Sequence, residues 1–320
     1  MKPIVIIGGG IAGYTLVKTL RALDNKTPII LITKDNGDYY SKPMLSNAFS
    51  KNQAVDNLVL VSGQEMARNY LLELWHNCVA KVIDTNREFV NTTQGVIHYD
   101  KLVLACGALP KKLPLFNLPN IFSINHLEDY RRFRITLASK KHIVILGSGL
   151  VGCEFANDLA QAGFHVTVIS MDNYPLQTFI PQAIGLKLKQ QLSLLGVDWY
   201  LATPVISVIS EQEGFQIHLS NGKVLTTELM LSAIGLEPNI SLAKESGIKV
   251  NRGIVTDAYL RTNCANIYGL GDCAEINGCL WPFIYPIRQG SHALAKTLLG
   301  QPSKICLSNL TPTVFKKGAE

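Results

Sequence analysis

Two short apolar runs, each followed by a glycine-rich turn, stand out in the hydrophobic pattern of the chain. The first run is Ile4–Ile7 and the second is Ile143–Leu146. A run of this length without polar alternation is typical of a parallel strand that is buried on both faces. The residues after each turn are predicted to form a helix, which ends near Leu23 in the first copy and near Gln161 in the second. The pattern therefore predicts the same strand–turn–helix unit at two places.

The similarity between the two copies extends beyond the turns. Each predicted helix leads to another apolar strand, Ile29–Ile32 in the first copy and Val166–Ile169 in the second. Each copy ends in an apolar strand, a glycine and a nearby proline, in "KLVLACGALP" and "ELMLSAIGLEPN". The simplest interpretation is two homologous halves that each bind a nucleotide. The predicted fold class is α/β, with two Rossmann-like three-layer dinucleotide-binding domains.

The rest of the chain completes this pattern. Short strands with turns are predicted between residues 78 and 105, and a helix is predicted near Pro181–Leu195. After residue 250 we expect two strands and a Gly-Asp turn. A last helix is predicted to start at Pro286 and to end at Gly300, because proline favours the first turn of a helix and glycine its end.

The two turns share the spacing G-x-G-x-x-G. They contain Gly8, Gly10 and Gly13 in the first copy, and Gly147, Gly149 and Gly152 in the second. In this motif the first glycine permits a tight turn, the second lets the backbone approach a pyrophosphate, and the third lets helix and strand pack closely. The helix N-terminus adds free N–H groups and the positive end of a dipole. Glycine-rich turns also arise for other reasons, but two matches in this context predict two dinucleotide sites.

Composition narrows the class of protein. The chain has 320 residues, 47% of them apolar and 17% charged, which is enough for two domains with large cores. No apolar run reaches the ~18–20 residues that span a bilayer. The apolar residues near the N-terminus lack the length and cleavage site of a signal peptide. We therefore expect a cytoplasmic protein that is not bound to a membrane.

Charge and cysteine usage restrict the partners. The net charge is +6, but the basic residues form no run, so nucleic-acid binding is not predicted. A basic surface suits an acidic protein partner. The seven cysteines show neither a C-x-x-C motif nor the spacing of a zinc site, and we expect reduced thiols and no bound metal.

Four segments carry a resemblance to a known family. They are "YYSKPMLSNAFSK", "GLVGCEFANDLA", "LSAIGLEPN" and "RTNCANIYGLGDCAEING". They resemble the rubredoxin–NAD(+) reductases, which belong to the FAD-dependent pyridine nucleotide oxidoreductases that include glutathione reductase. The resemblance implies FAD and a nicotinamide nucleotide as cofactors, with hydride passing from one to the other. It also implies that Asp272 accepts a hydrogen bond from the ribityl chain of FAD. The alternative is an ordinary aspartate in a Gly-Asp turn.

The same resemblance implies a domain organisation. The FAD-binding domain would be discontinuous, at residues 1–108 and 244–320, with the NAD(P)H-binding domain inserted at 109–243. Related reductases continue into a third, antiparallel domain, whereas this sequence stops at "TVFKKGAE". A C-terminal third domain is therefore expected to be missing, and we expect a monomer or a weak dimer.

One loop distinguishes this chain from the disulfide reductases of the superfamily. Those enzymes carry one or two redox cysteines facing the flavin, but residues 41–46 here read Ser-Lys-Pro-Met-Leu-Ser. Because this loop has no thiol, the electrons cannot leave through a thiol relay there. The resemblance instead implies one-electron transfer to a small acidic redox protein such as rubredoxin.

Two residues are candidates for catalytic roles. Lys42 would stabilise negative charge on the reduced flavin, the alternative being a solvated loop lysine. Glu154 follows Gly152 by two residues, on what we expect to be the first turn of its helix. The resemblance implies that it lies beside the flavin and the nicotinamide and can pair with the lysine. Its alternative role is to stabilise the N-terminus of its own helix.

Two sets of residues are expected to bind the cofactors. For FAD they are Gly8, Gly10, Ile11, Ala12, Gly13, Thr33, Lys34, Lys42, Pro43, Ala80, Ala105, Gly107, Glu154, Gly271, Asp272, Ile284 and Lys316. For NAD they are Gly147, Gly149, Leu150, Val151, Gly152, Ser170 and Gly235.

The expected ribose-binding acid is missing from both halves. The first half has Thr33-Lys34 at that place, with Asp35 close behind, and the second has Ser170, with Asp172 two residues on. No arginine follows Ser170 within ten residues, so the positive clamp for a 2′-phosphate is also missing. We therefore expect NADH to be preferred over NADPH.

Two other functions are consistent with the same residues. One is an NAD(P)H-sensing FAD-binding protein that acts through its conformation and has no competent electron exit. The other is a flavin module of a different electron-transfer system.

Overall fold

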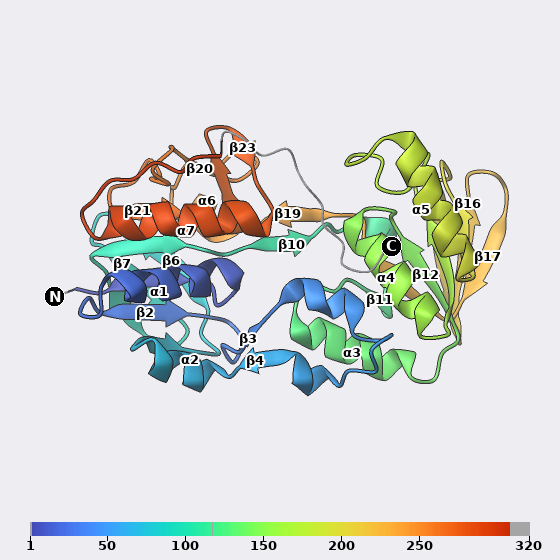
Figure 1. Cartoon of the computed structure of the whole chain (residues 1–320), viewed down its shortest axis with the longest axis horizontal. Coiled ribbons are helices and arrows are strands. Elements are labelled where there is room, and N and C mark those ends of the chain that lie inside the picture. The colour runs from blue at the N-terminus through green and yellow to red at the C-terminus, as the bar shows by residue number, and fades with distance from the viewer. Residues whose placement is uncertain (1, 117, 308–320) are drawn as a thin grey trace. The chain divides into compact units, whose positions relative to one another are not determined.

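The computed structural model describes residues 2–116 and 118–307, which form two compact units (Figure 1). Within these residues, unit 1 comprises 2–40, 59–109 and 237–307, and unit 2 comprises 41–58 and 110–236. Each unit is built on a five-stranded parallel sheet.

The sheet of unit 1 has the order β21-β9-β1-β2-β5. Its strands are β1 (Ile4–Ile7), β2 (Ile29–Ile32), β5 (Glu73–Trp75), β9 (Lys101–Leu104) and β21 (Ile267–Gly269). All four residues of β1 and of β2 are buried, as predicted from their apolar runs. The interior positions of β1 and β2 explain this burial, because an interior strand of a parallel sheet that is covered on both faces has no solvent-facing side.

Helices cover one face of this sheet. Helix α1 (Ile11–Leu23) packs against α7 (Ile284–Leu298), and the two lie side by side in Figure 1. Leu16, Leu20 and Leu294 are almost completely buried in the core that these helices share with the sheet. The opposite face has a second core, in which Ile83, Val90 and other residues of an antiparallel sheet pack.

The remaining elements of unit 1 are short. They are β3 (Tyr39–Tyr40), β4 (Val59–Val61), α2 (Gly63–Asn69), β6 (Ala80–Asp84), β7 (Phe89–Thr92), β8 (Val96–His98), α6 (Ser241–Glu245), β20 (Ile254–Thr256), η4 (Gly271–Cys273), β22 (Ala274–Ile276) and β23 (Cys279–Leu280). The chain passes between the units four times, after residues 40 and 58 and within β10 (Ala108–Pro110) and β19 (Leu236–Pro238).

The sheet of unit 2 repeats this plan, in the order β11-β18-β12-β13-β14. Its strands are β11 (Ile121–Phe122), β12 (His142–Leu146), β13 (His165–Ile169), β14 (Val197–Tyr200) and β18 (Leu229–Ser232). The helices are α3 (Leu127–Leu137), α4 (Leu150–Gln161), α5 (Gln182–Leu194), η1 (Lys42–Asn47), η2 (Val55–Leu58) and η3 (Pro114–Phe116).

An antiparallel sheet forms a third layer of unit 2. Its strands are β15 (Val205–Glu211), β16 (Gly214–Leu219) and β17 (Val224–Thr227). Alternate residues of β16, including Phe215 and Ile217, are buried against Val144 and Met230 of the parallel sheet. The predicted fold class, α/β with Rossmann-like three-layer units, is confirmed.

The compact units divide the chain at different residues from the predicted domains. Residues 41–58 group with unit 2, and unit 1 resumes at residue 237. The ring of Phe49 explains part of this grouping, because it packs edge-on against Tyr130 and Phe133 of α3. The assignment of FAD to residues 1–108 and 244–320, and of NAD(P)H to 109–243, stays a prediction.

Two expected elements differ from the structure. The last helix begins at Ile284 rather than Pro286, so that proline lies inside the first turn. Its N-cap is Phe283, which makes no side-chain cap and left no signature in the sequence. The segment 253–276 forms three strands, β20, β21 and β22, rather than the two expected, because residues 274–276 pair with β20 and with the following β23. In the described residues, no helix combines the length and the apolarity that a membrane crossing requires.

Candidate cofactor sites and active-site residues

The first glycine turn joins β1 to α1, and its geometry excludes side chains. Gly8 has φ +127°, and a Cβ there would lie 2.1 Å from the carbonyl oxygen of Ala105. A Cβ on Gly13 would lie 1.9 Å from the carbonyl oxygen of Gly8. A larger residue at Gly8 would clash with the backbone after β9, and one at Gly13 would push α1 away from the turn, so the close approach of backbone to backbone requires both glycines.

The second glycine turn has the same contacts. Gly147 has φ +101°, and a Cβ there would lie 2.6 Å from the carbonyl oxygen of Ala233. A Cβ on Gly152 would lie 2.0 Å from the carbonyl oxygen of Gly147. Ala105 and Ala233 occupy corresponding places in the two repeats, so the internal repeat extends to the backbone contacts of each turn.

The middle glycine of each turn faces open space. A Cβ on Gly10 or on Gly149 would meet no heavy atom of the described residues within 4 Å. Both glycines are N-caps in an extended conformation, and neither helix start has a side-chain cap in the part of the chain that the structure describes. These open N-termini can receive the phosphates of a dinucleotide. The residues present therefore fit FAD and NAD(H).

Several predicted FAD residues of unit 1 lie around the first turn. A Cβ on Gly271, which has φ +81°, would lie 2.8 Å from the Cβ of Ala12. A Cβ on Gly9 would lie 2.8 Å from the Thr33 hydroxyl. Ala105 donates its backbone N–H to Ile7 at 2.9 Å. The structure thus brings Ala12, Thr33, Ala105 and Gly271 to the glycine turn.

Other predicted FAD residues are not tied to the turn by these contacts. Lys34 is exposed, Ala80 begins β6, and Ile284 begins α7 with 39% of its surface exposed. Gly107 has φ +69° and accepts a hydrogen bond from Asn239 N–H at 3.0 Å, while Asp272 lies on η4. Lys316 lies outside the described residues. The FAD-binding roles of all these residues stay predictions.

A hydroxyl–carboxylate pair follows the second strand of each repeat. In unit 1, Thr33 Oγ1 donates to Asp35 Oδ1 at 2.6 Å, and the Gly37 N–H donates to the same oxygen at 3.0 Å. In unit 2, Ser170 Oγ donates to Asp172 Oδ2 at 3.1 Å. Each aspartate keeps one oxygen that accepts no hydrogen bond from the described residues. These oxygens are acceptors at the place where a ribose acid was expected.

The pair in unit 2 includes a residue that the sequence analysis missed. Ser148, between the first two glycines of the second turn, is fully buried, and its Oγ lies within hydrogen-bond distance of both Ser170 Oγ (2.9 Å) and Asp172 Oδ2 (3.0 Å). The shared pattern of a hydroxyl residue, any residue and then aspartate, at 33–35 and 170–172, was the available signal for this arrangement.

The catalytic candidates Lys42 and Glu154 both belong to unit 2, as does Pro43 in the first turn of η1. Lys42 Nζ donates to Asn125 Oδ1 at 3.4 Å, and Asn125 is 6% exposed. Ser46 Oγ donates to Glu154 Oε2 at 2.8 Å. Helix α4 therefore carries a carboxylate that holds the segment containing the lysine.

The expected position of Glu154 was wrong. Helix α4 begins at Leu150, so Glu154 is its fifth residue and no acidic residue lies in the first turn. Because the helix dipole acts mainly within the first turn, Glu154 is poorly placed for the expected alternative of stabilising the start of its own helix. Its carboxylate accepts a hydrogen bond from Ser46. Leu150 and the half-exposed Val151 form that first turn instead, beside Gly149.

Two thiols lie close to the FAD residues predicted in unit 1. Cys106 follows Ala105, and Cys273 follows Asp272. Their side chains share a hydrogen bond, which together with burial raises the pKa of the Cys106 thiol. Cys273 Sγ also contacts the carbonyl oxygen of Leu104 at 3.3 Å. Both are free cysteines, and neither lies in the segment 41–46.

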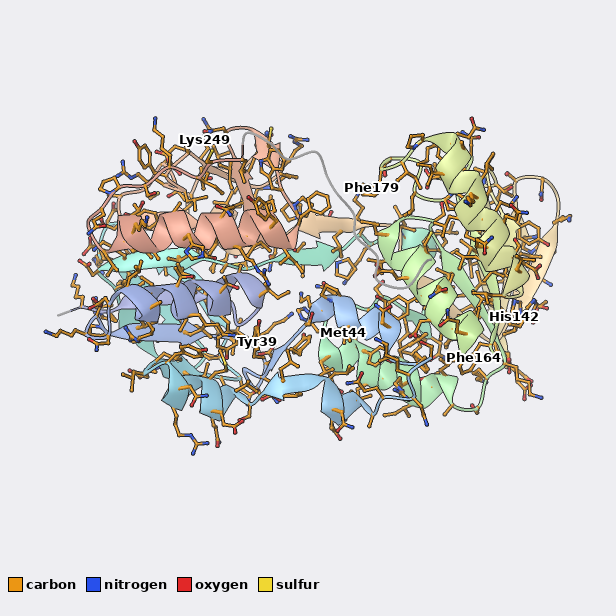
Figure 2. All side chains as sticks on the ribbon, viewed as in Figure 1. Tyr39, Met44, His142, Phe164, Phe179 and Lys249 are labelled. Atoms are coloured by element: carbon orange, nitrogen blue, oxygen red, sulfur yellow. The ribbon has the colours of Figure 1, made fainter. Side chains whose placement is uncertain are left out.

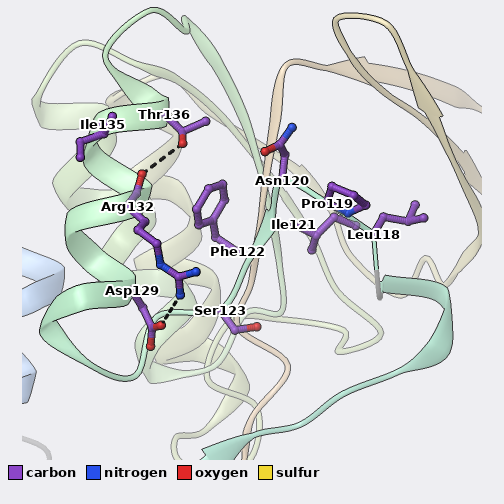
Figure 3. A pocket seen from close by; sticks show the side chains of 10 residues that line it. All are labelled: Leu118, Pro119, Asn120, Ile121, Phe122, Ser123, Asp129, Arg132, Ile135 and Thr136. Atoms are coloured by element: carbon purple, nitrogen blue, oxygen red, sulfur yellow. Dashed lines mark hydrogen bonds and ion pairs between the residues drawn. The ribbon is translucent and has the colours of Figure 1, made fainter. Parts of the chain in front are cut away.

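A surface pocket in unit 2 contains none of the predicted site residues. It lies between β11 and α3, and its walls combine apolar residues with an ion pair of Arg132 and Asp129 at 2.9 Å (Figure 3). Because Asp129 already pairs with the guanidinium, the pocket offers little uncompensated charge. Within residues 2–116 and 118–307, no three or more His, Cys, Asp or Glu side chains are grouped to hold a metal ion.

Comparison with known proteins identifies the class. Residues 2–297 match the pyridine nucleotide-disulphide oxidoreductase family, and the chain belongs to this family. It is therefore an NAD(P)H-dependent FAD oxidoreductase, and the predicted cofactors FAD and NAD(H) are confirmed.

Two relatives are more specific. The chain is 41% identical over 315 residues to the rubredoxin-NAD(+) reductase of Acinetobacter baylyi, covering 95% of this chain and 80% of the relative. It is 40% identical over 318 residues to that of Alcanivorax borkumensis, covering 98% and 83%. The resemblance inferred from the sequence is confirmed.

A solved structure supports the fold. The ferredoxin reductase for the CYP199A2 system of Rhodopseudomonas palustris superposes with a TM-score of 0.90, at 24% identity, over 96% of this chain and 78% of that chain.

Proposed function

We propose that the protein transfers electrons from NADH, through FAD, to a small iron-containing carrier such as rubredoxin. The observation that carries this proposal is the segment held by α4. In disulfide reductases the matching loop supplies redox cysteines. Here that loop, residues 41–46, contains no cysteine, and its Ser46 donates a hydrogen bond to Glu154. The relatives at 40–41% identity, which are rubredoxin-NAD(+) reductases, support the same acceptor class.

The two glycine turns would divide the cofactors between the units. The turn of Gly8, Gly10 and Gly13 would hold the FAD pyrophosphate on the N-terminus of α1, which carries no acidic residue in its first turn. The turn of Gly147, Gly149 and Gly152 would hold NADH in the same way on α4. When bound, FAD supplies the ability to accept a hydride and to release two electrons one at a time.

Lys42 and Glu154 would act through charge. The Lys42 ammonium, held by the buried Asn125 side chain, would stabilise developing negative charge on the bound cofactor. The Glu154 carboxylate, held by Ser46, would orient the nicotinamide ring of NADH and would offset the positive charge of Lys42.

The charge of the chain supports an acidic partner. A net charge of +6 would attract a small acidic carrier and accelerate its encounter, an effect that salt screens. We expect the protein to do this as a monomer or a weak dimer.

The test compares three acceptors under anaerobic conditions with FAD-loaded protein and NADH. We expect catalytic reduction of rubredoxin, at a rate that falls as salt is raised, and weaker reduction of a plant-type ferredoxin. We expect no reduction of glutathione disulfide. Reduction of the disulfide at the rubredoxin rate, or no reduction of either iron protein, would contradict the proposal.

A further inference from the structure

Helix α4 carries a second carboxylate that the proposed reaction does not use. Asp158 lies one helical turn after Glu154 and is 1% exposed. Its Oδ2 accepts the Phe49 N–H at 2.9 Å. Its Oδ1 accepts both the Ser50 N–H at 2.9 Å and the Ser50 hydroxyl at 2.6 Å. One buried side chain thus binds three donors from a segment more than a hundred residues away in sequence.

The chemistry of these donors requires a carboxylate. Removing a charged group from water is costly unless hydrogen bonds satisfy it, and here both oxygens are used. The two backbone donors lie outside any helix or strand, so they depend on this side chain. An asparagine would place its NH2 group against one of the N–H donors, because an amide has only one acceptor oxygen.

Phe49 fixes the same point of the segment by packing. Its ring makes edge-on contacts with Tyr130, Phe133 and Phe164, with centroid distances of 5.6, 6.1 and 5.9 Å (Figure 2 labels Phe164). The Arg134 guanidinium lies 4.6 Å from the ring centroid and also donates to the carbonyl of Gln53. The segment is therefore anchored to α3 and α4 at its C-terminal end.

The catalytic candidate lies at the other end of this anchored segment. Lys42 begins η1, and Ser46 within η1 departs from helical geometry, with φ −91° and ψ 17°. A short 3₁₀ helix has poor hydrogen-bond geometry and little stability of its own. The position of η1 therefore depends on its contacts with α4, where Glu154 holds Ser46 and Asp158 holds residues 49 and 50.

We propose that Asp158 is a positioning residue for the reaction. By holding Phe49 and Ser50 on α4, it keeps the Ser46–Glu154 hydrogen bond formed and Lys42 in its working position. Glu154 and Asp158 are spaced i and i+4 on one helix face, so a single rigid helix aligns the whole lysine segment. This inference rests on the proposed function, because it assigns Lys42 and Glu154 to the reaction.

The first test is Asp158→Asn in the FAD-loaded full chain, studied by anaerobic stopped-flow reduction with NADH. We expect the limiting rate of flavin reduction to fall by about tenfold or more, because a small misplacement of a catalytic group has large effects on rate. We expect the dissociation constant of NADH to change by less than about twofold, since the glycine turn is intact. Hydrogen exchange at the amides of residues 49 and 50 should become faster.

Ser50→Ala is the second variant, because Asp158→Asn disturbs a buried site and can reduce folding. Ser50 is exposed, and this substitution removes only the hydroxyl donor at 2.6 Å. We expect a fall of about threefold in the limiting rate, in keeping with one lost hydrogen bond. The matched control is Asn157→Ala, on the same helix, whose side chain accepts from Gln161 at 3.3 Å and from no other of the described residues. It should leave the rate unchanged.

The outcomes separate the two proposals. If the wild-type protein fails to oxidise NADH, the proposed function is wrong. The second outcome requires that the wild type and the Asn157→Ala control both react. If Ser50→Ala and any folded Asp158→Asn protein then also react at the wild-type rate, Asp158 has only a structural role and this inference is overturned. A selective loss of the limiting rate, with NADH binding retained, supports it.

Discussion

The Ser46 hydroxyl donates a 2.8 Å hydrogen bond to the Glu154 carboxylate, and this bond joins η1 to the helix that follows the second glycine turn. Ser46 is 4% exposed, so the bond is shielded from water. A charged acceptor in a dry place makes a stronger hydrogen bond than one in solvent. Its contribution to catalysis can be separated from the charge of Glu154 itself.

Glu154→Gln keeps an oxygen that can accept from Ser46 but removes the negative charge. We expect the rate of flavin reduction by NADH to fall by about tenfold or more, because preorganised charge is a major source of rate enhancement. Ser46→Ala keeps the charge and removes one hydrogen bond, so its loss should be only about fivefold, corresponding to ~1 kcal/mol. Stopped-flow absorbance measures both rates. Equal rates for the wild type and Glu154→Gln would remove Glu154 from the reaction.

Gly10→Leu and Gly149→Leu test the two cofactor sites against each other. Each new side chain would enter the open space that faces a helix N-terminus. We expect Gly10→Leu protein to purify without FAD. We expect Gly149→Leu protein to keep FAD but to bind NADH at least about tenfold more weakly, which corresponds to ~1.4 kcal/mol. Flavin content and equilibrium titration measure these effects. Loss of FAD from the Gly149 variant alone would reverse the assignment.

Asp172 is expected to set the nucleotide preference. Its carboxylate is held by Ser148 and Ser170, and its other oxygen can accept a ribose 2′-hydroxyl but repels a 2′-phosphate. Asp172→Ser should raise the ratio of kcat/KM for NADPH to that for NADH by about tenfold. Asp198→Ser is the control. Asp198 is exposed near the amino end of β14, and its substitution also removes one negative charge. An unchanged ratio in the Asp172 variant would contradict this role.

Stability should depend on pH through His142. This residue, labelled in Figure 2, begins β12. Its ring stacks on His165 with a centroid distance of 4.4 Å, and its Nε2 lies 3.0 Å from Thr167 Oγ1. Burial, and then the nearby His165, lower the pKa of His142 below its ordinary value, although a hydrogen bond to the Thr226 backbone and the charges of Glu228 and Asp198 act in the opposite direction. Because the pKa of His142 is lower in the folded than in the unfolded protein, its contribution to the free energy of unfolding is present above about pH 6.5 and is lost as the pH falls.

Thermal unfolding of wild-type protein between pH 7 and pH 5 measures this dependence. We expect the midpoint to fall with pH, and we expect His142→Gln to reduce the slope. His98→Gln, which changes an exposed histidine of unit 1, should keep it. A slope that is the same in all three proteins would show that His142 does not contribute.

The parts of the site that depend on local geometry could be predicted from the sequence. Gly8 and Gly147 require φ values that other residues avoid, and Gly13 and Gly152 lie against backbone in the same turn. These constraints require a glycine at a fixed position after each apolar strand, and that glycine is visible in the sequence. The two turns and their flanking strands and helices were therefore predictable to within a residue or two.

The parts that depend on distant contacts could not be predicted in this way. The grouping of residues 41–58 with unit 2 rests on Phe49 and Asp158, which lie far apart in sequence. Periodicity carries no information about such a pairing. Likewise, Ser148 stands at a position of the glycine motif where any residue is allowed, so the motif does not predict the contacts of its hydroxyl with Ser170 and Asp172.

The most direct test is an anaerobic titration of the purified FAD-loaded protein with NADH, followed by the visible absorbance of the flavin. The account predicts a yellow protein whose flavin band bleaches with one equivalent of NADH and returns when oxidised rubredoxin is added. A protein that takes up no flavin, or whose flavin stays oxidised in the presence of NADH, would contradict it.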